Sequence, residues 1–361
     1  MKSKEIISFP HLGDYYIPIT FVLKKLLKME VKPAPPITNK TIELGIKNSP
    51  DFVCIPFKYN LGNLIEALES GSTILVQAGG GCRYGYYAEV QEQILKDLGY
   101  NFKWYTLLNQ KYNGPIYMYK TLKKIKPHLS IFKYIYYGLL TILMIWYMDK
   151  IDKKIRSNIG FEKKKGSHQK LKKEMLHAFE EIHTFSGLSR KYFKYKHKFN
   201  LLKTDKPKNC LKVGIIGELY TSMEPFSSYF LECELASLHI EIKRFTNLTY
   251  LLFQKKQQEK KLLKLIPKYC KYTIGADGMD NIARCQILAN EHYDGIIHIK
   301  PFGCTPEIGA MPIIDKICHD NNIPIIYFSF DSNTSEVGIK TRLEAFYDML
   351  NMRKGKENKN E

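Results

Sequence analysis

The stretch GIIHIKPFGCTPE, residues 295–307, decides how this sequence is expected to fold. Its first five residues are almost wholly apolar, which is typical of a strand buried on both faces of a parallel sheet. The strand is expected to end where residues 300–303 interrupt the apolar run, and residues 308–321 then have the spacing of a helix. A strand, a turn and a helix in this order form the repeating unit of an open α/β sheet.

The same alternation of strands and helices extends outward from this stretch in both directions. Apolar runs of strand length occur at residues 51–55, 73–77, 102–107, 211–216, 240–245, 295–299 and 323–329. Helical patterns occur at residues 17–29, 41–47, 61–70, 86–98, 231–238, 252–266, 282–291, 308–321 and 341–350. The sequence therefore predicts an α/β fold with two open, mostly parallel, Rossmann-like domains.

The length of the chain favours more than one domain. A single hydrophobic core stops growing at about 250–300 residues, and this chain has 361. We predict an N-terminal α/β domain over residues 1–119, a basic helical segment over 120–208 and a C-terminal α/β domain over 209–352. The charged residues 353–361 are predicted to form a disordered tail.

The positive charge of the chain is concentrated in the middle segment. The formal net charge is +19, and residues 120–208 carry 23 Lys and Arg against 7 Asp and Glu. Two interpretations remain open: a solvated helical face, or a docking surface for an acidic partner or for the phosphates of coenzyme A. Because Lys far outnumbers Arg, nucleic acid is not the expected partner, since base edges are read mainly by bidentate Arg.

The middle segment also contains an apolar run at residues 129–148 that is long enough to cross a membrane. It includes Lys133 and several tyrosines, and we interpret it as a buried helix packed between domains. The N-terminus lacks the apolar core of a secretion signal, and eight widely spaced cysteines do not suggest a disulfide framework. We therefore expect a cytoplasmic protein without membrane insertion.

Three of the eight cysteines share a context. Cys54 lies near the end of a predicted strand, Cys82 follows a strand through three glycines, and Cys304 lies in the turn after the strand at 295–299. Ligands bind at the carboxyl ends of strands in open α/β sheets, and thiolates that converge there bind zinc or iron–sulfur clusters. From spacing alone, small buried side chains are the better interpretation. We keep that interpretation for the other five cysteines, Cys210, Cys233, Cys270, Cys285 and Cys318.

Several strings around these cysteines resemble the signatures of the 2-hydroxyacyl-CoA dehydratase superfamily, above all its CoA protein activase-related, double-cubane-cluster reductase group. The strings are CIPFK (54–58), GGCRYGYY (80–87), VGIIGELY (213–220), GMDNI (278–282), GIIHIKPFGCTPE (295–307) and TRLEAF (341–346). The resemblance implies a 4Fe–4S cluster, a double cubane in that group, held by Cys54, Cys82 and Cys304. It also implies reduction by an ATP-hydrolysing activator of the actin/Hsp70-like type.

The expected function is an iron–sulfur electron-transfer or reductase component that passes low-potential electrons to an acyl-CoA or another small acceptor. The sequence contains no GxxxxGK[ST] loop, so we expect the chain to accept electrons from the activator without binding ATP itself. The alternatives are a non-catalytic interaction protein stabilised by a cluster or a metal, and a nucleic-acid-binding protein. Pairing with a second copy of the chain stays open.

Carboxylates near the predicted strand ends are candidates for proton transfer. Glu218 and Glu307, and with them Glu224, either move a proton coupled to reduction or cap the helix that follows. Both roles remain open. His298 lies within an apolar strand and is expected to be a hydrogen-bonded core histidine rather than a ligand.

Overall fold

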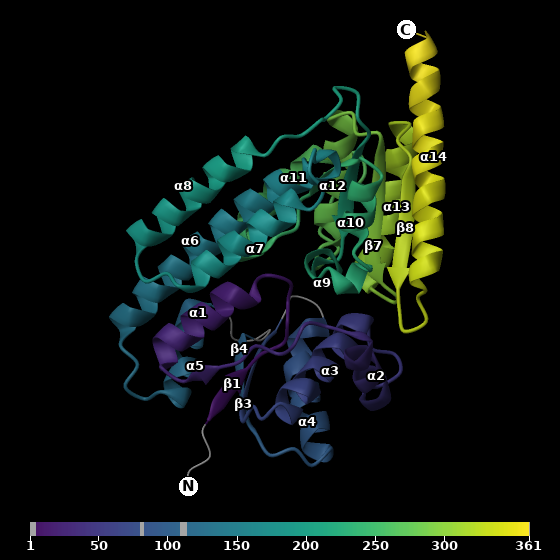
Figure 1. Cartoon of the computed structure of the whole chain (residues 1–361). Coiled ribbons are helices and arrows are strands. Elements are labelled where there is room, and N and C mark those ends of the chain that lie inside the picture. The colour runs from purple at the N-terminus through teal and green to yellow at the C-terminus, as the bar shows by residue number, and fades with distance from the viewer. Residues whose placement is uncertain (1–4, 80–82, 109–113, 361) are drawn as a thin grey trace. The chain divides into compact units, whose positions relative to one another are not determined.

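The computed structural model describes residues 5–79, 83–108 and 114–360 of the chain. The chain divides into two compact units, residues 1–145 with 179–185 and residues 146–178 with 186–361. Each unit contains one four-stranded sheet in which every pair of neighbouring strands is parallel (Figure 1). The predicted α/β fold with two open parallel sheets is therefore confirmed. The predicted domain boundaries stay a prediction.

The first unit is built around the sheet β2-β1-β3-β4. Its strands are β1 (Ile6–Ser8), β2 (Glu30–Val31), β3 (Ile74–Ala78) and β4 (Lys103–Leu108). Its helices include α1 (Tyr16–Leu27), α2 (Asn39–Asn48), α3 (Ile55–Glu69), α4 (Tyr87–Asp97) and α5 (Pro115–Ile125), with the 3-10 turn η1 (Arg83–Tyr86). Alternate side chains of β3 enter two different cores: Ile74 and Val76 pack with residues of α1, and Leu75 packs with residues of α3 and α4. Helices therefore cover both faces of this sheet.

The second unit is built around the sheet β6-β5-β7-β8. Its strands are β5 (Lys212–Gly217), β6 (Glu241–Arg244), β7 (Gly295–Pro301) and β8 (Ile325–Phe330). Its helices include α9 (Leu219–Met223), α10 (Leu231–Ser237), α11 (Lys255–Leu265), α12 (Gly278–Asn290), α13 (Thr305–Asp320) and α14 (Glu336–Asn360), with the short turns η2 (Ile159–Phe161), η3 (Phe226–Ser228) and η4 (Tyr250–Gln254).

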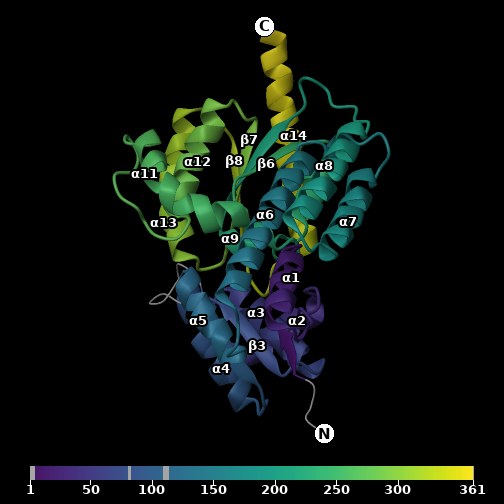
Figure 2. The same ribbon diagram turned by 90° about the vertical axis from the view of Figure 1, so that its left-hand side faces the viewer.

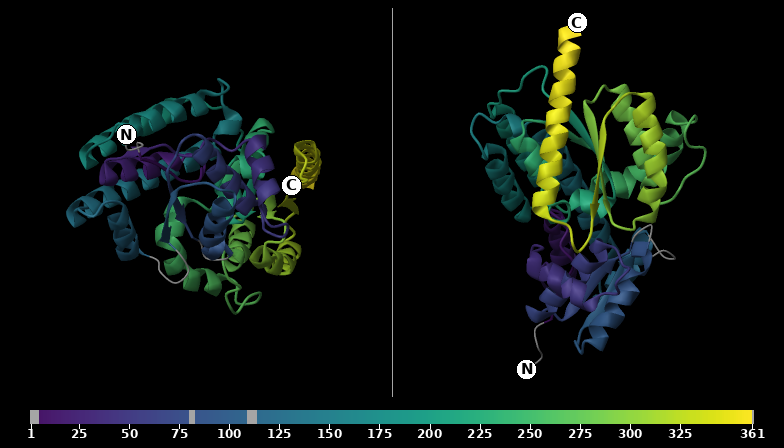
Figure 3. Two further views of the ribbon diagram at one scale, coloured as in Figure 1. Left: turned by 90° about the horizontal axis from the view of Figure 1, so that it is seen from below. Right: turned by 90° about the vertical axis from the view of Figure 1, so that its right-hand side faces the viewer.

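Two strand glycines identify the helices on the two faces of this second sheet. A Cβ atom at Gly214 would meet Leu288 of α12, and one at Gly295 would meet Leu350 of α14. Because these glycines lie on opposite faces of the pleat, α12 and α14 cover opposite sides of the sheet. Figure 2 shows α11, α12 and α13 together on one side of β7 and β8. The right panel of Figure 3 shows α14, in yellow, on the other side.

Residues 120–205 contain helices and no strand of a sheet, as predicted. The three long helices here are α6 (Ile131–Arg156), α7 (Ser167–Glu180) and α8 (Phe185–Leu201). Among the described helices, α6 alone is long and apolar enough to cross a membrane, and 33% of its most apolar window is buried. The core helix of a soluble protein passes the same test of length and composition. The burial predicted for this helix is therefore only partial.

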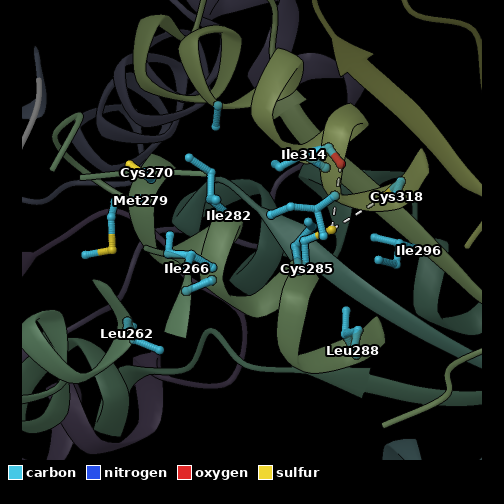
Figure 4. Close-up of a cluster of buried hydrophobic side chains, with 14 of the residues drawn as sticks. Leu262, Ile266, Cys270, Met279, Ile282, Cys285, Leu288, Ile296, Ile314 and Cys318 are labelled. Atoms are coloured by element: carbon cyan, nitrogen blue, oxygen red, sulfur yellow. Dashed lines mark hydrogen bonds between the residues drawn. The ribbon is translucent and has the colours of Figure 1, made fainter. Parts of the chain in front are cut away.

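The core of the second unit contains most of the cysteines that were expected to be plain apolar side chains. Figure 4 shows Cys285 of α12 facing Cys318 of α13, and their Sγ atoms lie 3.5 Å apart. The hydrogen bond with Cys318, together with burial, raises the pKa of Cys285, so this thiol is inert. Cys210 and Cys270 are also buried, as predicted, whereas Cys233 is exposed and its predicted burial is wrong.

Two other predictions about elements are wrong. Residues 51–53 form a turn instead of a strand, and Cys54 occupies the N-cap position of α3. The tail that was predicted to be disordered from Arg353 onward instead continues α14 to Asn360. Lys354 anchors this extension, because its Nζ donates to the carbonyl oxygen of Cys210 at 3.1 Å and to Asp294 Oδ1 at 2.8 Å.

Candidate functional site

The order of the strands places a topological switch point in the second sheet. The chain leaves β5 for β6 on one side and returns to β7 on the other. In open α/β sheets, ligands bind outside the carboxyl ends of the strands that flank such a point. Here these two ends lead directly to Glu218, after β5, and to the turn that carries Cys304, after β7. Both residues were singled out from the sequence.

The close approach of β5 and β7 at this point requires a glycine. Gly217 has a φ of +139°, and a Cβ atom there would lie 1.9 Å from the carbonyl oxygen of Ile299. The next residue donates its backbone N–H to that same oxygen at 3.0 Å. Gly217 therefore lets the chain leave β5 against the backbone of β7, and this fixes the position of Glu218.

Glu218 is buried and carries out the capping role that was one of its two predicted alternatives. Its carboxylate accepts hydrogen bonds from the backbone N–H groups of Tyr220 and Thr221 at 3.0 and 2.9 Å, and from the Thr221 hydroxyl at 2.8 Å. Burial raises the pKa of Glu218 to about 7, with a smaller contribution from the negative charge of Asp277. The carboxyl can therefore exchange a proton near neutral pH as well as cap α9.

Cys304 is the N-cap residue of α13, and its local sequence explains this position. Pro306 occupies the first turn of the helix, where its missing N–H is not needed. The backbone N–H of Cys304 donates to the carbonyl oxygen of Pro301 at 3.2 Å, which closes the turn after β7. The side chain is partly exposed. The positive end of a helix stabilises a thiolate, so this position suits ligation of a metal or a cluster.

Cys54 has the same local arrangement in the first unit. It is the N-cap of α3, Pro56 lies in the first turn of that helix, and the thiol is partly exposed. Its Sγ contacts the hydroxyl of Tyr87. The two Cys-X-Pro sequences therefore present two thiols in the same way, at the N-termini of two helices. The donor chemistry of both sites fits an iron–sulfur cluster.

Cys82, the third predicted ligand, lies outside the described residues. In sequence it follows β3, as Cys304 follows β7. Among the residues that the structure describes, no three His, Cys, Asp or Glu side chains are grouped so that they could hold a metal ion. The convergence of Cys54, Cys82 and Cys304 stays a prediction.

A buried hydrogen-bonded chain crosses from β7 to α12 beneath the start of α13. Glu307 Oε2 lies 2.7 Å from His298 Nε2, and both oxygens of Glu307 accept from Asn281 Nδ2, at 2.9 and 3.0 Å. Arg284 Nη1 donates to Asn281 Oδ1 at 3.2 Å and to Thr246 Oγ1 at 2.8 Å. His298 and Glu307 are 0% and 1% exposed. His298 is therefore a core histidine with a partner, as predicted.

One buried polar atom of this hydrogen-bonded chain has no hydrogen-bond partner in the part of the protein that the structure describes. His298 Nδ1 is buried and has no hydrogen-bond partner among the described residues. His298 is thus held in the core of the second unit through Nε2, by its pair with Glu307.

Two further groups give the region its charge. Lys300 is buried at the end of β7 and donates to Ser329 Oγ at 2.9 Å; burial lowers its pKa against the opposing effects of Cys304 and Glu307. At the start of α12, Asp280 accepts a hydrogen bond from the Tyr250 hydroxyl at 2.7 Å, and burial raises the pKa of this carboxyl.

The contribution of α12 to this site was not predicted. A signal for it exists in the sequence, because polar residues at the N-cap and in the first two turns of α12 have the spacing i, i+3, i+4, i+7, at positions Asp277, Asp280, Asn281 and Arg284. That spacing places them on one face of a helix. Beside the apolar residues Ile282, Cys285 and Leu288, such a face indicates a buried polar network.

The comparison with known families finds a match in this same part of the chain. Residues 251–350 match the model of the 2-hydroxyglutaryl-CoA dehydratase, D-component family, a range that includes α12, β7 and Cys304. A search of curated proteins gives no match to the chain. Residues 251–350, which hold Cys304 and the buried Glu307–His298 pair, are thus the part of the chain that is similar to a 2-hydroxyacyl-CoA dehydratase component.

Proposed function

We propose that this protein is an iron–sulfur electron-transfer component related to 2-hydroxyacyl-CoA dehydratases. In this proposal Cys54, Cys82 and Cys304 hold a 4Fe–4S cluster. An ATP-hydrolysing activator of the actin/Hsp70-like type reduces it, and the electrons pass to an acyl-CoA or another small acceptor. A bound cluster would supply one-electron transfer at low potential.

The observation that carries the proposal is the position of Cys304. It lies in the segment that matches the dehydratase D-component family, and it occupies the N-cap position of a helix at the switch point of an open α/β sheet. A partly exposed thiol at a helix N-terminus has the electrostatic setting of a thiolate ligand. Cys54 repeats this setting, which supports the choice of the same chemistry for both residues.

The carboxylates around the switch point supply the second part of the proposal. Glu218 is placed to hold a proton on its carboxyl near neutral pH, because its pKa is raised to about 7. Glu307 and His298 form a hydrogen-bonded pair that is out of contact with water. Reduction of a small acceptor consumes protons as well as electrons, and buried acids of this kind deliver them. Glu218 is therefore the first candidate for proton transfer and Glu307 the second.

The first test measures iron and acid-labile sulfide in protein purified without oxygen. The full chain should contain both and should show absorbance from thiolate-to-iron charge transfer. Cys54→Ala, Cys82→Ala and Cys304→Ala should each lose most of this absorbance. The control is Cys210→Ala, which removes a buried thiol outside the predicted ligand set and should keep it. Full iron in all three ligand variants would overturn the cluster assignment.

The second test separates electron transfer from a structural role of the cluster. The loaded protein is mixed with an ATP-hydrolysing activator of a 2-hydroxyacyl-CoA dehydratase and Mg²⁺-ATP, and its electron paramagnetic resonance spectrum is recorded. Appearance of a reduced-cluster signal that depends on ATP supports the proposal. A cluster that stays oxidised under these conditions would favour the alternative, a non-catalytic interaction protein stabilised by its cluster.

A further inference from the structure

The hydroxyl of Tyr87 lies against the sulfur of Cys54, within hydrogen-bonding reach. Tyr87 is the first residue of α4 and is only 5% exposed. Cys54 occupies the N-cap position of α3, 33 residues earlier in the chain. The contact therefore joins a predicted cluster ligand to a buried side chain from another helix of the same unit.

The ring of Tyr87 is held in place by α3 itself. It meets the ring of Phe57 edge-on, with 4.9 Å between the ring centres and an angle of 87° between the ring planes. Phe57 lies in the first turn of α3, and its backbone N–H donates to the carbonyl oxygen of Cys54 at 3.0 Å. The turn that presents the thiol therefore also carries the aromatic ring against which the Tyr87 side chain packs.

A buried amide fixes the helix that carries Tyr87. Gln91 lies one turn farther along α4, on the same face, and is 0% exposed. Its Nε2 donates to the carbonyl oxygen of Phe57 at 3.3 Å, and its Oε1 accepts from Gln77 Nε2 of β3 at 2.8 Å. Because α4 is tied in this way to both α3 and the sheet, the Tyr87 hydroxyl has a defined position.

The contact between hydroxyl and sulfur has one polarity when the cysteine is a ligand. A cysteine that binds a metal or a cluster is a thiolate, which accepts hydrogen bonds and has no proton to donate. A tyrosine hydroxyl keeps its proton at neutral pH, so the phenol is the donor. Hydrogen bonds to a charged acceptor are among the stronger ones in proteins. Those made to the sulfurs of an iron–sulfur cluster are one of the features that set its reduction potential.

We propose that Tyr87 raises the reduction potential of the iron–sulfur cluster by donating a hydrogen bond to the thiolate of Cys54. The inference rests on the proposed function, in which Cys54 is a ligand of the cluster. Reduction by one electron adds one negative charge to the cluster and its thiolates. The hydrogen bond offsets part of that charge and so stabilises the reduced state more than the oxidised state. Tyr87 acts through Cys54 and makes the cluster easier for the activator to reduce.

The test is a redox titration of the full chain loaded with its cluster, followed by electron paramagnetic resonance. Tyr87→Phe keeps the ring but removes the donor. At a fixed potential the ratio of reduced to oxidised cluster should fall about tenfold, which corresponds to a midpoint lower by about 59 mV for one electron. The matched control is Tyr86→Phe, which removes the hydroxyl of the neighbouring tyrosine, a residue that is 63% exposed. It should keep the wild-type midpoint.

A second variant should move the midpoint in the opposite direction. With 3-fluorotyrosine at position 87, the side chain keeps almost the same size, and its more acidic phenol is a stronger hydrogen-bond donor. The titration is run below neutral pH, where this phenol keeps its proton. The midpoint should rise above the wild-type value, which a purely structural role of Tyr87 does not predict. An unchanged or lower midpoint would overturn the proposal.

The remaining outcomes separate this inference from the proposed function. Equal midpoints in wild type and Tyr87→Phe, with the cluster present in both, would overturn the inference and leave the proposed function standing. Loss of iron in Tyr87→Phe alone would mean that the hydroxyl holds the cluster, and would overturn a role in its potential. Wild-type protein without iron, or full iron in Cys54→Ala, would overturn the ligand assignment and the inference with it.

Discussion

Glu218 caps a helix and also titrates near neutral pH, and the second property has a measurable effect on stability. Its pKa is raised to about 7 in the folded protein from an ordinary value of 4.5. Between these two pH values the folded state holds more protons than the unfolded state. The free energy of unfolding should therefore fall as the pH rises through this range, and should not change further above it.

The Glu218→Gln variant removes this titration. Between pH 4.5 and 7 the wild-type protein should lose up to ~3 kcal/mol of stability from this group, and the variant should not. Urea unfolding at several pH values gives the two slopes. The control is Glu344→Gln on the exposed side of α14, which should keep the wild-type slope. Identical slopes for Glu218→Gln and wild type would contradict the raised pKa.

Asn281 joins the two ends of the buried hydrogen-bonded chain. Its Nδ2 donates to both oxygens of Glu307 and its Oδ1 accepts from Arg284. Asn281→Ala leaves a buried carboxylate and a buried guanidinium each short of a partner, so we expect a loss of about 1–3 kcal/mol. Denaturant unfolding measures it. The matched control is Asn290→Ala, at the exposed end of the same helix, which should stay within about 0.5 kcal/mol of wild type.

At the scale of elements, the predicted bounds agree best with the observed ones where the apolar run in the sequence is long. The strands predicted at 73–77, 102–107, 211–216, 240–245, 295–299 and 323–329 lie within two residues of the observed ends. β1 and β2 were missed because three and two residues are too short to show a period. The apolar run at 51–55 lies between Pro50 and Pro56, and a proline in the first turn favours a helix start.

The same effect of proline explains two helices that begin earlier than predicted. α3 and α13 each start one residue before a proline, whereas the predicted helices began at residues 61 and 308. At that position the proline loses no hydrogen bond and its fixed φ suits the helix. This error matters for the site, because it hid the N-cap positions of Cys54 and Cys304. The Glu307–His298 pair was unpredictable for another reason, since it depends on how α13 packs on β7.

The close approach of β5 and β7 can be tested at Gly217. Gly217→Ala places a Cβ atom against the Ile299 carbonyl oxygen and forces a residue with a side chain into a positive φ. We expect a loss of more than about 2 kcal/mol, measured by thermal or denaturant unfolding. Gly355→Ala in α14 is the matched control, because a Cβ atom there meets nothing within 4 Å. It should be neutral or stabilising, and a similar loss in both variants would contradict this account.

At the scale of the whole molecule, the proposed division of labour with an activator requires that the chain itself does not bind ATP. Its one run of glycines, Gly79–Gly81, leads to Cys82 and not to the Lys and Ser or Thr of a phosphate-binding loop. Titration of the full chain with Mg²⁺-ATP should therefore give no saturable heat. Saturable binding in the sub-millimolar range would show a nucleotide site and would reassign ATP hydrolysis to this chain.

The division of the chain into units also has a consequence for protein synthesis. The first unit uses residues 179–185 in addition to 1–145, and residues of the second unit lie between them in sequence. Lys25, for example, contacts His183 at 2.7 Å, and Tyr136 contacts Phe185. A nascent chain therefore cannot complete its first unit until residue 185 has left the ribosome. Residues 146–178 of the second unit are therefore synthesised before the first unit can fold completely.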